Sequence, residues 1–240
     1  MDNELHLTQH ISKKFNQELE DVRNQVLKMG GLVEQQVSDG LTALLDANKV
    51  LGQEVIDRDH EVNAMEVEID ETCIEILARR QPAASDLRLM VSIIKTITDL
   101  ERIGDEAEKL GVNALKLADV DSNGNSNHHF IELRNLGDTV KKMLKRSLNA
   151  YARMDVDEAI DIIKSDALVN QEFDNISRLL VMKMMEDPRE IKNALRVSWC
   201  ARALERIGDH SQNICEYIIY LVKGKDVRHL GLDDLKKHIL

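Results

Sequence analysis

The hexapeptide Leu-Glu-Arg-Ile-Gly-Asp occurs twice in this chain, at residues 100–105 and again at residues 204–209. The similarity extends upstream of each copy, because a shift of 107 positions aligns identical residues of the two halves: Gly30 with Gly137, Val33 with Val140, Leu41 with Leu148, Asp59 with Asp166, Val62 with Val169 and Asn63 with Asn170. The hexapeptides are 104 positions apart, so a small insertion or deletion lies between these segments. A chain made of two copies of one unit is restricted to folds in which that unit occurs twice.

The first unit carries three runs of apolar residues with the period of an α-helix. The first run covers 15–44, with steps of three and four residues between apolar positions. Gly30 and Gly31 lie inside it and weaken a helix, so we expect a bend or a close contact there. The second run covers about 50–79, Pro82 interrupts the pattern, and a third run follows. Each run is long enough to form one helix of a bundle.

The second unit repeats this pattern after a segment rich in Asn, Ser, Asp and Gly, which is typical of a linker. Asp155 and Asp187 stand where helix N-caps are needed, each with a glutamate three residues later, and Pro188 follows the second cap. We therefore predict an all-α fold of two tandem antiparallel three-helix bundles that arose by internal duplication. The predicted boundaries are 1–118 for the first repeat, 119–129 for the linker, 130–224 for the second repeat and 225–240 for a C-terminal tail.

Composition agrees with helices and excludes several classes of function. Aromatic residues make up 3% of the chain and charged residues 31%, which favours helices with aliphatic stripes over β-sandwiches or barrels. The formal net charge of −11 repels phosphate backbones, so we expect no nucleic-acid partner. The cysteines show no Cys-x-x-Cys spacing, the N-terminal residues are too polar for a signal peptide, and no apolar run approaches about 18 residues. We expect free thiols in a soluble, cytoplasmic protein that meets membranes only through its partners.

Each hexapeptide places two carboxylates on one face of its helix. Glu101 and Asp105 are four residues apart, as are Glu205 and Asp209, so the members of each pair lie one helical turn apart. Steps of three and four from the preceding apolar residues lead to both members of each pair. We therefore expect these acids to lie along the apolar seam, where ionised carboxylates cost several kcal/mol unless a cation meets them.

A further aspartate is expected beside each pair. If the chain reverses near residue 81, Asp59 comes level with residue 103, and a reversal near residue 187 brings Asp166 level with residue 208. Asn63 and Asn170 follow these aspartates one turn further along. Oxygen-rich clusters of this kind suit divalent ions such as magnesium, manganese or ferrous iron. The glycine of each hexapeptide would let a neighbouring group approach closely.

Two other interpretations of these acids remain open from the residues alone. A glutamate and an aspartate four residues apart, next to an arginine, also occur on solvated helix faces and in salt bridges between helices. An acidic seam that a bundle presents to a partner protein would explain the same residues without any metal. The repetition of the pattern in both units, together with the matched aspartates, favours the metal site.

Three segments make the chain similar to a known family: the duplicated hexapeptide, RRQPAASDLRL at 79–89 and CARALERIGDHSQNICEY at 200–217. They resemble the PhoU family of phosphate transport system regulators, and the resemblance extends from about Lys13 to Lys225. It implies tandem three-helix bundles in a cytoplasmic, usually homodimeric protein without enzymatic activity. It also implies a negative regulator of phosphate uptake and of the phosphate-starvation response, which bridges the phosphate ABC transporter and a phosphate-sensing histidine kinase.

The same resemblance implies multinuclear metal clusters held by Glu/Asp-x-x-x-Asp motifs. The pairs Glu101–Asp105 and Glu205–Asp209 match this motif residue for residue, whereas two further segments match it only as Asp-x-x-x-Asn: Asp59–Asn63 and Asp166–Asn170. An amide offers a neutral oxygen in place of a charged one. The expected ions are iron, manganese, magnesium or zinc, and no organic cofactor is expected.

Other classes of protein fit the sequence less well, although a metal-binding helical scaffold or a di-metal carboxylate enzyme remains the alternative. A ferritin-type di-iron enzyme needs Glu-x-x-His on two helices, and that spacing does not occur. His10 has a spacing loosely typical of phosphotransfer histidines but no counterpart in the second unit. The chain has no Walker motif and therefore no ATPase of its own. Trp199, Tyr217 and Tyr220 flank the second hexapeptide, and we expect them to pack or to line an interface.

Overall fold

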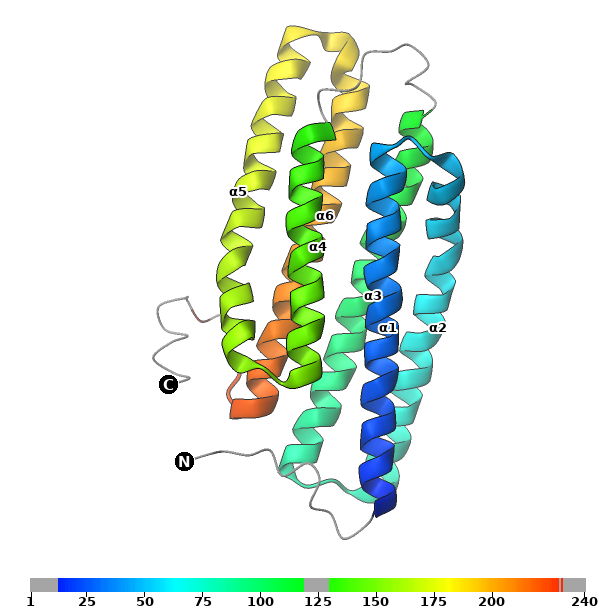
Figure 1. Cartoon of the computed structure of the whole chain (residues 1–240), viewed down its shortest axis with the longest axis vertical. Helices are drawn as coiled ribbons and strands as arrows, with labels where there is room; N and C mark the ends of the chain where they lie inside the picture. The colour runs from blue at the N-terminus through cyan, green and yellow to red at the C-terminus, as the bar shows by residue number, and fades with distance from the viewer. Residues whose placement is uncertain (1–12, 119–129, 229, 231–240) are drawn as a thin grey trace.

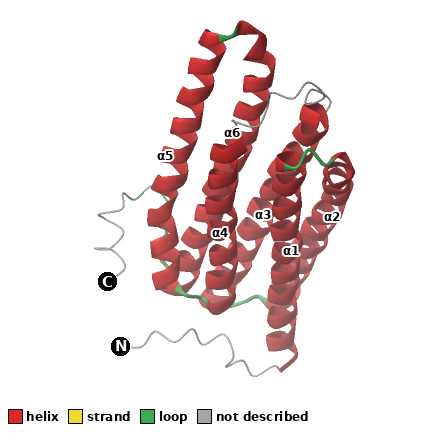
Figure 2. Cartoon of the chain, turned by 45° about the horizontal axis from the view of Figure 1, so that its top comes forward, coloured by secondary structure: helices red, strands yellow, loops and turns green. Residues whose placement is uncertain are grey.

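The computed structural model describes residues 13–118, 130–228 and 230, and their helices confirm the predicted all-α fold of two three-helix units (Figure 1). The helices and their bounds are α1 (Lys13–Leu45), α2 (Lys49–Arg80), α3 (Ala84–Ala118), α4 (Phe130–Arg153), α5 (Val156–Glu186), the short 3-10 helix η2 (Pro188–Glu190) and α6 (Ile191–Lys223). No strand occurs in these residues (Figure 2). None of the described helices has an apolar stretch sufficient to cross a bilayer. His10 and the predicted linker 119–129 lie outside the described residues.

Local capping explains where several helices begin. Asn48 precedes α2, and its side chain accepts a hydrogen bond from a backbone N–H three residues later at 3.1 Å. Asp155 caps α5 as predicted, accepting the N–H of Glu158 at 3.0 Å. Asp187 instead accepts the N–H of Arg189, and the 3-10 helix η2 precedes α6. The sixth helix therefore begins later than its capping pattern predicts.

The two units pack together through their first and third helices. α1 lies antiparallel to α4 and α3 lies antiparallel to α6, so that equivalent helices of the two units meet (Figures 1 and 2). Buried apolar residues of all six α-helices form one continuous core. The sequence predicts two bundles, and the structure joins them into one body with a shared interior.

Glycines at equivalent positions bring α1 and α4 close together. A Cβ atom built on Gly30 would lie 2.7 Å from Cδ2 of Leu148, and one built on Gly137 would overlap with the side chain of Leu41. These contacts are reciprocal, because the shift of 107 positions exchanges the two glycines and the two leucines. The close contact expected at Gly30 is confirmed, and the side chain that packs against this glycine belongs to the other unit. α1 passes through this contact as one continuous helix.

A buried aspartate joins α3 to α6. The carboxylate of Asp99, which is 2% exposed, accepts hydrogen bonds from three side chains of α6: His210 Nδ1 at 2.7 Å, Asn213 Nδ2 at 3.1 Å and the Tyr217 hydroxyl at 2.7 Å. Burial raises the pKa of the Tyr217 hydroxyl, and its hydrogen bond to Asp99 raises that pKa further. The network is therefore a buried polar connection between the two units.

The arginine of the second hexapeptide makes another contact between the units. Arg206 on α6 lies 3.1 Å from Glu106 on α3, and the glutamate is 3% exposed. The interhelical salt bridge that the sequence leaves open is therefore present for this arginine. Of the three aromatic residues near the second hexapeptide, Tyr217 and Tyr220 lie under the ammonium group of Lys95, whereas Trp199 is 57% exposed.

Gly111→Ala is expected to lower the free energy of unfolding by about 1–3 kcal/mol, the usual cost of overpacking. A Cβ built on Gly111 would lie 2.7 Å from the backbone oxygen of Gly52, and a helix backbone cannot rotate aside as a side chain can. The matched control is Gly31→Ala, because a Cβ there has no neighbour within 4 Å. Loss of a helical glycine at that site should stabilise by roughly 0.5–1 kcal/mol. Urea unfolding measures both variants, and a stabilised Gly111→Ala protein would contradict the close packing of α2 and α3.

Candidate functional site

The carboxylates predicted in the first unit meet where α2 packs against α3. Asp59 comes from α2, and Glu101 and Asp105 come from α3. Glu108 follows one turn later on the same face of α3, and oxygens of Asp59, Asp105 and Glu108 lie within 4.8 Å of one another. Glu66 on α2 is close enough to perturb the titration of Glu101. We call these five residues the first-unit cluster.

The glycine of each hexapeptide determines how closely its helix approaches the preceding one. A Cβ built on Gly104 would lie 3.2 Å from Val62 and 3.4 Å from Oδ1 of Asp59. In the second unit, a Cβ on Gly208 would lie 3.7 Å from Oδ1 of Asp166. Both hairpins therefore have the register predicted from the sequence. The glycines permit the packing that brings each aspartate level with its Glu–Asp pair.

In the first unit the acids lie beside the apolar stripe instead of on it. The buried stripe of α3 follows Ile97, Leu100 and Gly104, whereas Glu101 and Asp105 are only half-buried. The expected seam position is therefore wrong for these two residues, which line the edge of α3 that faces α2. A half-buried edge costs an ionised carboxylate less than a core position does, so several acids can share it.

The two asparagines orient the aspartates that precede them by one turn. Asn63 donates a hydrogen bond from Nδ2 to Oδ2 of Asp59 at 2.9 Å, and Asn170 donates the same bond to Asp166 at 2.7 Å. Each amide N–H faces its aspartate, and both asparagines are exposed. Direct ligation of a metal by their amide oxygens, which the family resemblance implies, stays a prediction.

Crowded negative charge characterises the first-unit cluster. Burial raises the pKa of Glu101, and the charges of Asp105, Glu66 and Asp59 raise it further. Burial also raises the pKa of Glu108, with added repulsion from Asp59 and Asp105. Basic residues adjacent in sequence oppose these shifts without cancelling them. A cation among these oxygens would relieve the repulsion that protonation otherwise relieves.

The second unit gathers three acids in the equivalent place, which we call the second-unit cluster: Asp166, Glu205 and Asp209. Glu205 is 7% exposed, so the predicted seam position holds for this glutamate, whereas Asp209 is exposed and the predicted seam position is wrong for it. Burial raises its pKa and Asp209 raises it further, while Arg202 opposes the shift. Arg202 donates a hydrogen bond to Oε1 of Glu205 at 2.8 Å. This cluster is therefore partly neutralised by the protein itself.

The two clusters differ at positions that the internal repeat makes equivalent. Glu66 of the first unit corresponds to Phe173 in the second, and Glu108 corresponds to Gln212. The guanidinium of Arg202 lies 5.8 Å from the centroid of the Phe173 ring, so an aromatic ring with a cation beside it takes the place of one acid, and an amide takes the place of the other. The first-unit cluster is the more acidic of the two and the stronger candidate for divalent ions.

Several buried oxygens in and beside these clusters have no hydrogen-bond partner in the described part of the chain, and they indicate whether a cation fits there. Oδ1 of Asp166 and Oε2 of Glu205 are both buried, and neither has a hydrogen-bond partner within the described residues. The amide oxygen of Gln36 is in the same situation, and the amide nitrogen of this residue donates a hydrogen bond to Oδ1 of Asp59 at 3.4 Å. Unpaired buried oxygens are rare because they lose their hydration without compensation. A divalent cation would satisfy them, and the all-oxygen donor set suits magnesium, manganese or ferrous iron better than zinc.

Both units match the model of the PhoU domain family, over residues 26–113 and 133–218. The chain belongs to the PhoU family. A relative from Pseudomonas aeruginosa, named phosphate-specific transport system accessory protein PhoU homolog, is 52% identical over 97% of this chain and 95% of its own length. Phosphate-specific transport system accessory protein PhoU of Escherichia coli is 50% identical over 97% of this chain and 95% of its own. The crystal structure of PhoU from P. aeruginosa matches with a TM-score of 0.85 at 51% identity, covering 88% of this chain and 100% of that chain.

Three residues of the site in this PhoU-family chain were missed by sequence reasoning. Glu66, Glu108 and Gln36 have different residues at the equivalent positions of the second unit, so a search for residues retained in both units passes over them. Glu108 carries a simple signal, because it lies three residues after Asp105 and therefore on the same helix face. Gln36 has no such signal, since its contact with Asp59 depends on how α1 packs against α2.

Proposed function

We propose that this protein is a non-enzymatic negative regulator of phosphate uptake and of the phosphate-starvation response. The proposal rests on its 52% identity, over 97% of the chain, with a protein named a phosphate-specific transport system accessory protein. In this role the chain acts in the cytoplasm as a homodimer. It bridges the phosphate ABC transporter, at the cytoplasmic ATPase side, and a phosphate-sensing histidine kinase. The net charge of −11 is consistent with protein partners and unfavourable for nucleic acids.

An exposed apolar surface supports a role in binding other proteins. It lies at the end of the α5–α6 hairpin, which projects beyond the first unit at the top of Figure 1. Six large side chains there are 41–79% exposed, and together we call them the α5–α6 apolar end: Leu179, Met182, Met185, Ile191, Leu195 and Trp199. Exposed apolar groups concentrated in one region mark interaction sites, and Met and Trp are enriched at interfaces. We propose this end as a contact for the transporter or the kinase.

The double variant Met182→Asp/Leu195→Asp is expected to lose repression of a phosphate-starvation reporter in cells that lack the natural protein. The two side chains are 57% and 41% exposed, so aspartate at these sites should disturb docking far more than folding. Ile74→Asp on α2 is the matched control, because Ile74 is 56% exposed and lies away from the α5–α6 apolar end.

The same strains can be used to recover partners by affinity purification under phosphate-replete conditions. The control variant should retain repression and co-purify with the transporter or the kinase, whereas the double variant should do neither. Full repression by a stably folded double variant would contradict the assignment of this surface. Full repression in cells without any copy of the chain would contradict the proposed function itself.

We also propose that both acidic clusters hold divalent ions. The buried oxygens without partners support this assignment, and so does the raised pKa of five of the cluster carboxyls: Glu101, Glu108, Asp166, Glu205 and Asp209. A di-metal carboxylate enzyme is not favoured as the function. Enzymes of that class use histidine beside the carboxylates, whereas His210, next to Asp209 in the second-unit cluster, is hydrogen-bonded to Asp99 on α3.

A further inference from the structure

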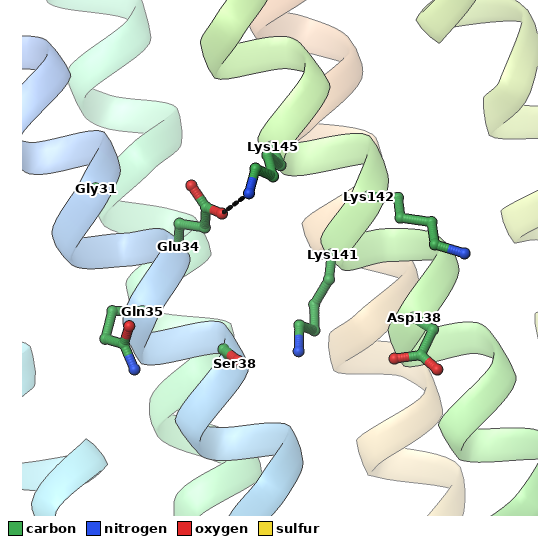
Figure 3. Close-up of a pocket in the computed structure, with 8 residues that line it drawn as sticks. All are labelled: Gly31, Glu34, Gln35, Ser38, Asp138, Lys141, Lys142 and Lys145. Carbon is green, nitrogen blue, oxygen red and sulfur yellow. Dashed lines mark ion pairs between the residues drawn. The ribbon is translucent and has the colours of Figure 1, made fainter.

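The groove between α1 and α4 gathers lysines in an otherwise acidic chain. It has a volume of about 590 Å³, within the usual range for small-molecule sites (Figure 3). α4 as a whole carries six basic and two acidic side chains, although the net charge of the chain is −11. The residues that line this α1–α4 groove are Gly31, Glu34, Gln35 and Ser38 from α1 and Asp138, Lys141, Lys142 and Lys145 from α4.

The walls of the groove are equivalent segments of the two units. The shift of 107 positions relates Gly31 to Asp138, and it relates Glu34, Gln35 and Ser38 to the three lysines. The groove therefore lies across the boundary between the units, beside the reciprocal glycine contacts of α1 and α4. Duplication alone would place similar groups on both walls. Instead the α4 wall carries three lysines and the α1 wall carries none, so the basic charge is concentrated on one side.

The ammonium groups in the groove have little protein charge to bind. Lys145 pairs with Glu34 at 3.8 Å, and both side chains are well exposed, so the pair is weak and easily displaced. Within the described part of the chain, Lys141 and Lys142 have no ion-pair partner. Figure 3 shows Lys141 reaching from α4 into the space between the two helices, at the level of Ser38. An anion in this space would meet Lys141 and Lys145 from one wall and the Ser38 hydroxyl from the other.

The α1 wall leaves room for such an anion. Gly31 has no side chain, and a Cβ built on it would find nothing within 4 Å. By contrast, the side chain of Leu148 fills the space beside the neighbouring glycine, Gly30. Two adjacent glycines therefore have separate consequences, since Gly30 brings the helices together and Gly31 keeps the groove between them open.

We propose that the α1–α4 groove binds a small phosphate-bearing anion across the two units, through Lys141, Lys145 and the hydroxyl of Ser38. Ammonium groups act as point charges that suit the several equivalent oxygens of a phosphate, whereas arginine is the usual choice for planar, bidentate carboxylate recognition. An extended polyanion or an acidic protein segment would be repelled by the overall charge of −11, and a small dianion meets mainly the local lysines. The proposal does not depend on the proposed function.

The test is calorimetric titration of the full-length protein with inorganic phosphate, pyrophosphate, ATP and sulfate, each at the same ionic strength. We expect saturable binding of at least one phosphate compound and weaker binding of sulfate. Lys141→Gln/Lys145→Gln should weaken that binding by roughly tenfold for each lysine removed. Gly31→Leu should block the groove sterically without changing any charge. The matched control is Lys116→Gln/Lys192→Gln, in which two exposed lysines of other helices lose their charge.

The ligands and the variants give results that can be told apart. Binding of inorganic phosphate at low concentration would identify free phosphate as the ligand, and binding of ATP alone would identify a nucleotide. The proposal is overturned if none of the three phosphate compounds binds saturably, or if sulfate binds equally well. It is also overturned if the control variant weakens binding as much as the groove variant, or if Gly31→Leu binds normally. Thermal unfolding without ligand shows whether each variant is folded before its binding is interpreted.

Discussion

Asp99→Ala is expected to lower the free energy of unfolding by about 3–5 kcal/mol, as is usual when one member of a buried charged network is removed. The substitution removes a single carboxylate from α3. It leaves the imidazole of His210, the amide of Asn213 and the hydroxyl of Tyr217 on α6 without their acceptor. The two buried donors, on His210 and Tyr217, then keep their desolvation penalties, which are about 1–3 kcal/mol for each polar group. The loss should appear in urea unfolding as a lower midpoint with an unchanged slope.

A surface aspartate provides the control for this prediction. Asp226 is paired with Arg228, and both side chains are more than two-fifths exposed, so Asp226→Ala should cost less than about 1 kcal/mol. Asp99→Asn tests the network more finely, because an amide keeps the shape but can accept only at one of its two terminal atoms. A loss at Asp99 no larger than that at Asp226 would mean that apolar packing alone holds α3 to α6.

Much of the fold could be predicted because the signals for it are local. Apolar steps of three and four residues, a proline after α2 and a capping aspartate before α5 each act within a few residues of where they stand. It could also be predicted that Asp59 lies beside Gly104. When two straight helices form a hairpin, the position of the turn alone determines which residues lie side by side. Helix period and turn position were therefore enough to bring the acids together.

The seam prediction failed at Glu101 and Asp105 for a geometric reason. Eighteen residues make five turns of an α-helix, so Asp105 lies on the same face of α3 as Leu87, an apolar residue in the first turn of that helix. Leu87 is 46% exposed and lies at the margin of the buried stripe instead of its centre, which passes through Leu100 and Gly104. An apolar residue near a helix end is thus a poor marker of the core, because it can be apolar without being buried.

The interface between the units could not be predicted from the repeat. Asp99 corresponds to Ala203 and His210 to Glu106, so the network between α3 and α6 has no second copy to reveal it. The glycine contacts do have two copies, but a residue retained twice does not say which helix it meets. Internal symmetry identifies what the two units share, whereas the polar network that joins α3 to α6 is built from residues in which the units differ.

Asp105→Ala is expected to weaken divalent metal binding at the first-unit cluster strongly. Changing a residue that only hydrogen-bonds to a metal ligand lowers metal affinity by roughly 10- to 100-fold, and we expect a larger loss at Asp105 because it is a proposed ligand itself. Its carboxylate lies among the oxygens of Asp59 and Glu108, so its removal takes away both a donor and part of the negative charge. Manganese titration of the untagged protein with a competing chelator measures the affinity, and elemental analysis measures the metal that co-purifies. Glu71→Ala, an exposed acid on α2, controls for lost charge and should change neither value.

The pH dependence of metal binding has a defined direction. Burial and neighbouring acids raise the pKa of Glu101 and Glu108, so these carboxyls take up protons at a higher pH than ordinary glutamates. The deprotonated form binds metal, and affinity should therefore fall as pH is lowered through the raised pKa values. The stability of the metal-free protein depends on pH in the opposite direction. The folded state holds these protons more tightly than the unfolded state does, so lowering the pH toward the ordinary pKa should stabilise the metal-free protein.

Exchanging the residues that distinguish the two clusters separates a metal site from a merely acidic surface. Glu108→Gln should lower the affinity of the first-unit cluster, and Gln212→Glu, the reciprocal change, should raise that of the second-unit cluster. If the clusters were only acidic surfaces, both substitutions would change metal affinity slightly, and high salt would abolish both changes. The double variant Glu101→Ala/Glu205→Ala should lose metal from both clusters. It should also fail to repress the phosphate-starvation reporter. Retention of metal by that folded double variant would refute the cluster assignment, whereas repression without metal would confine the ions to a structural role.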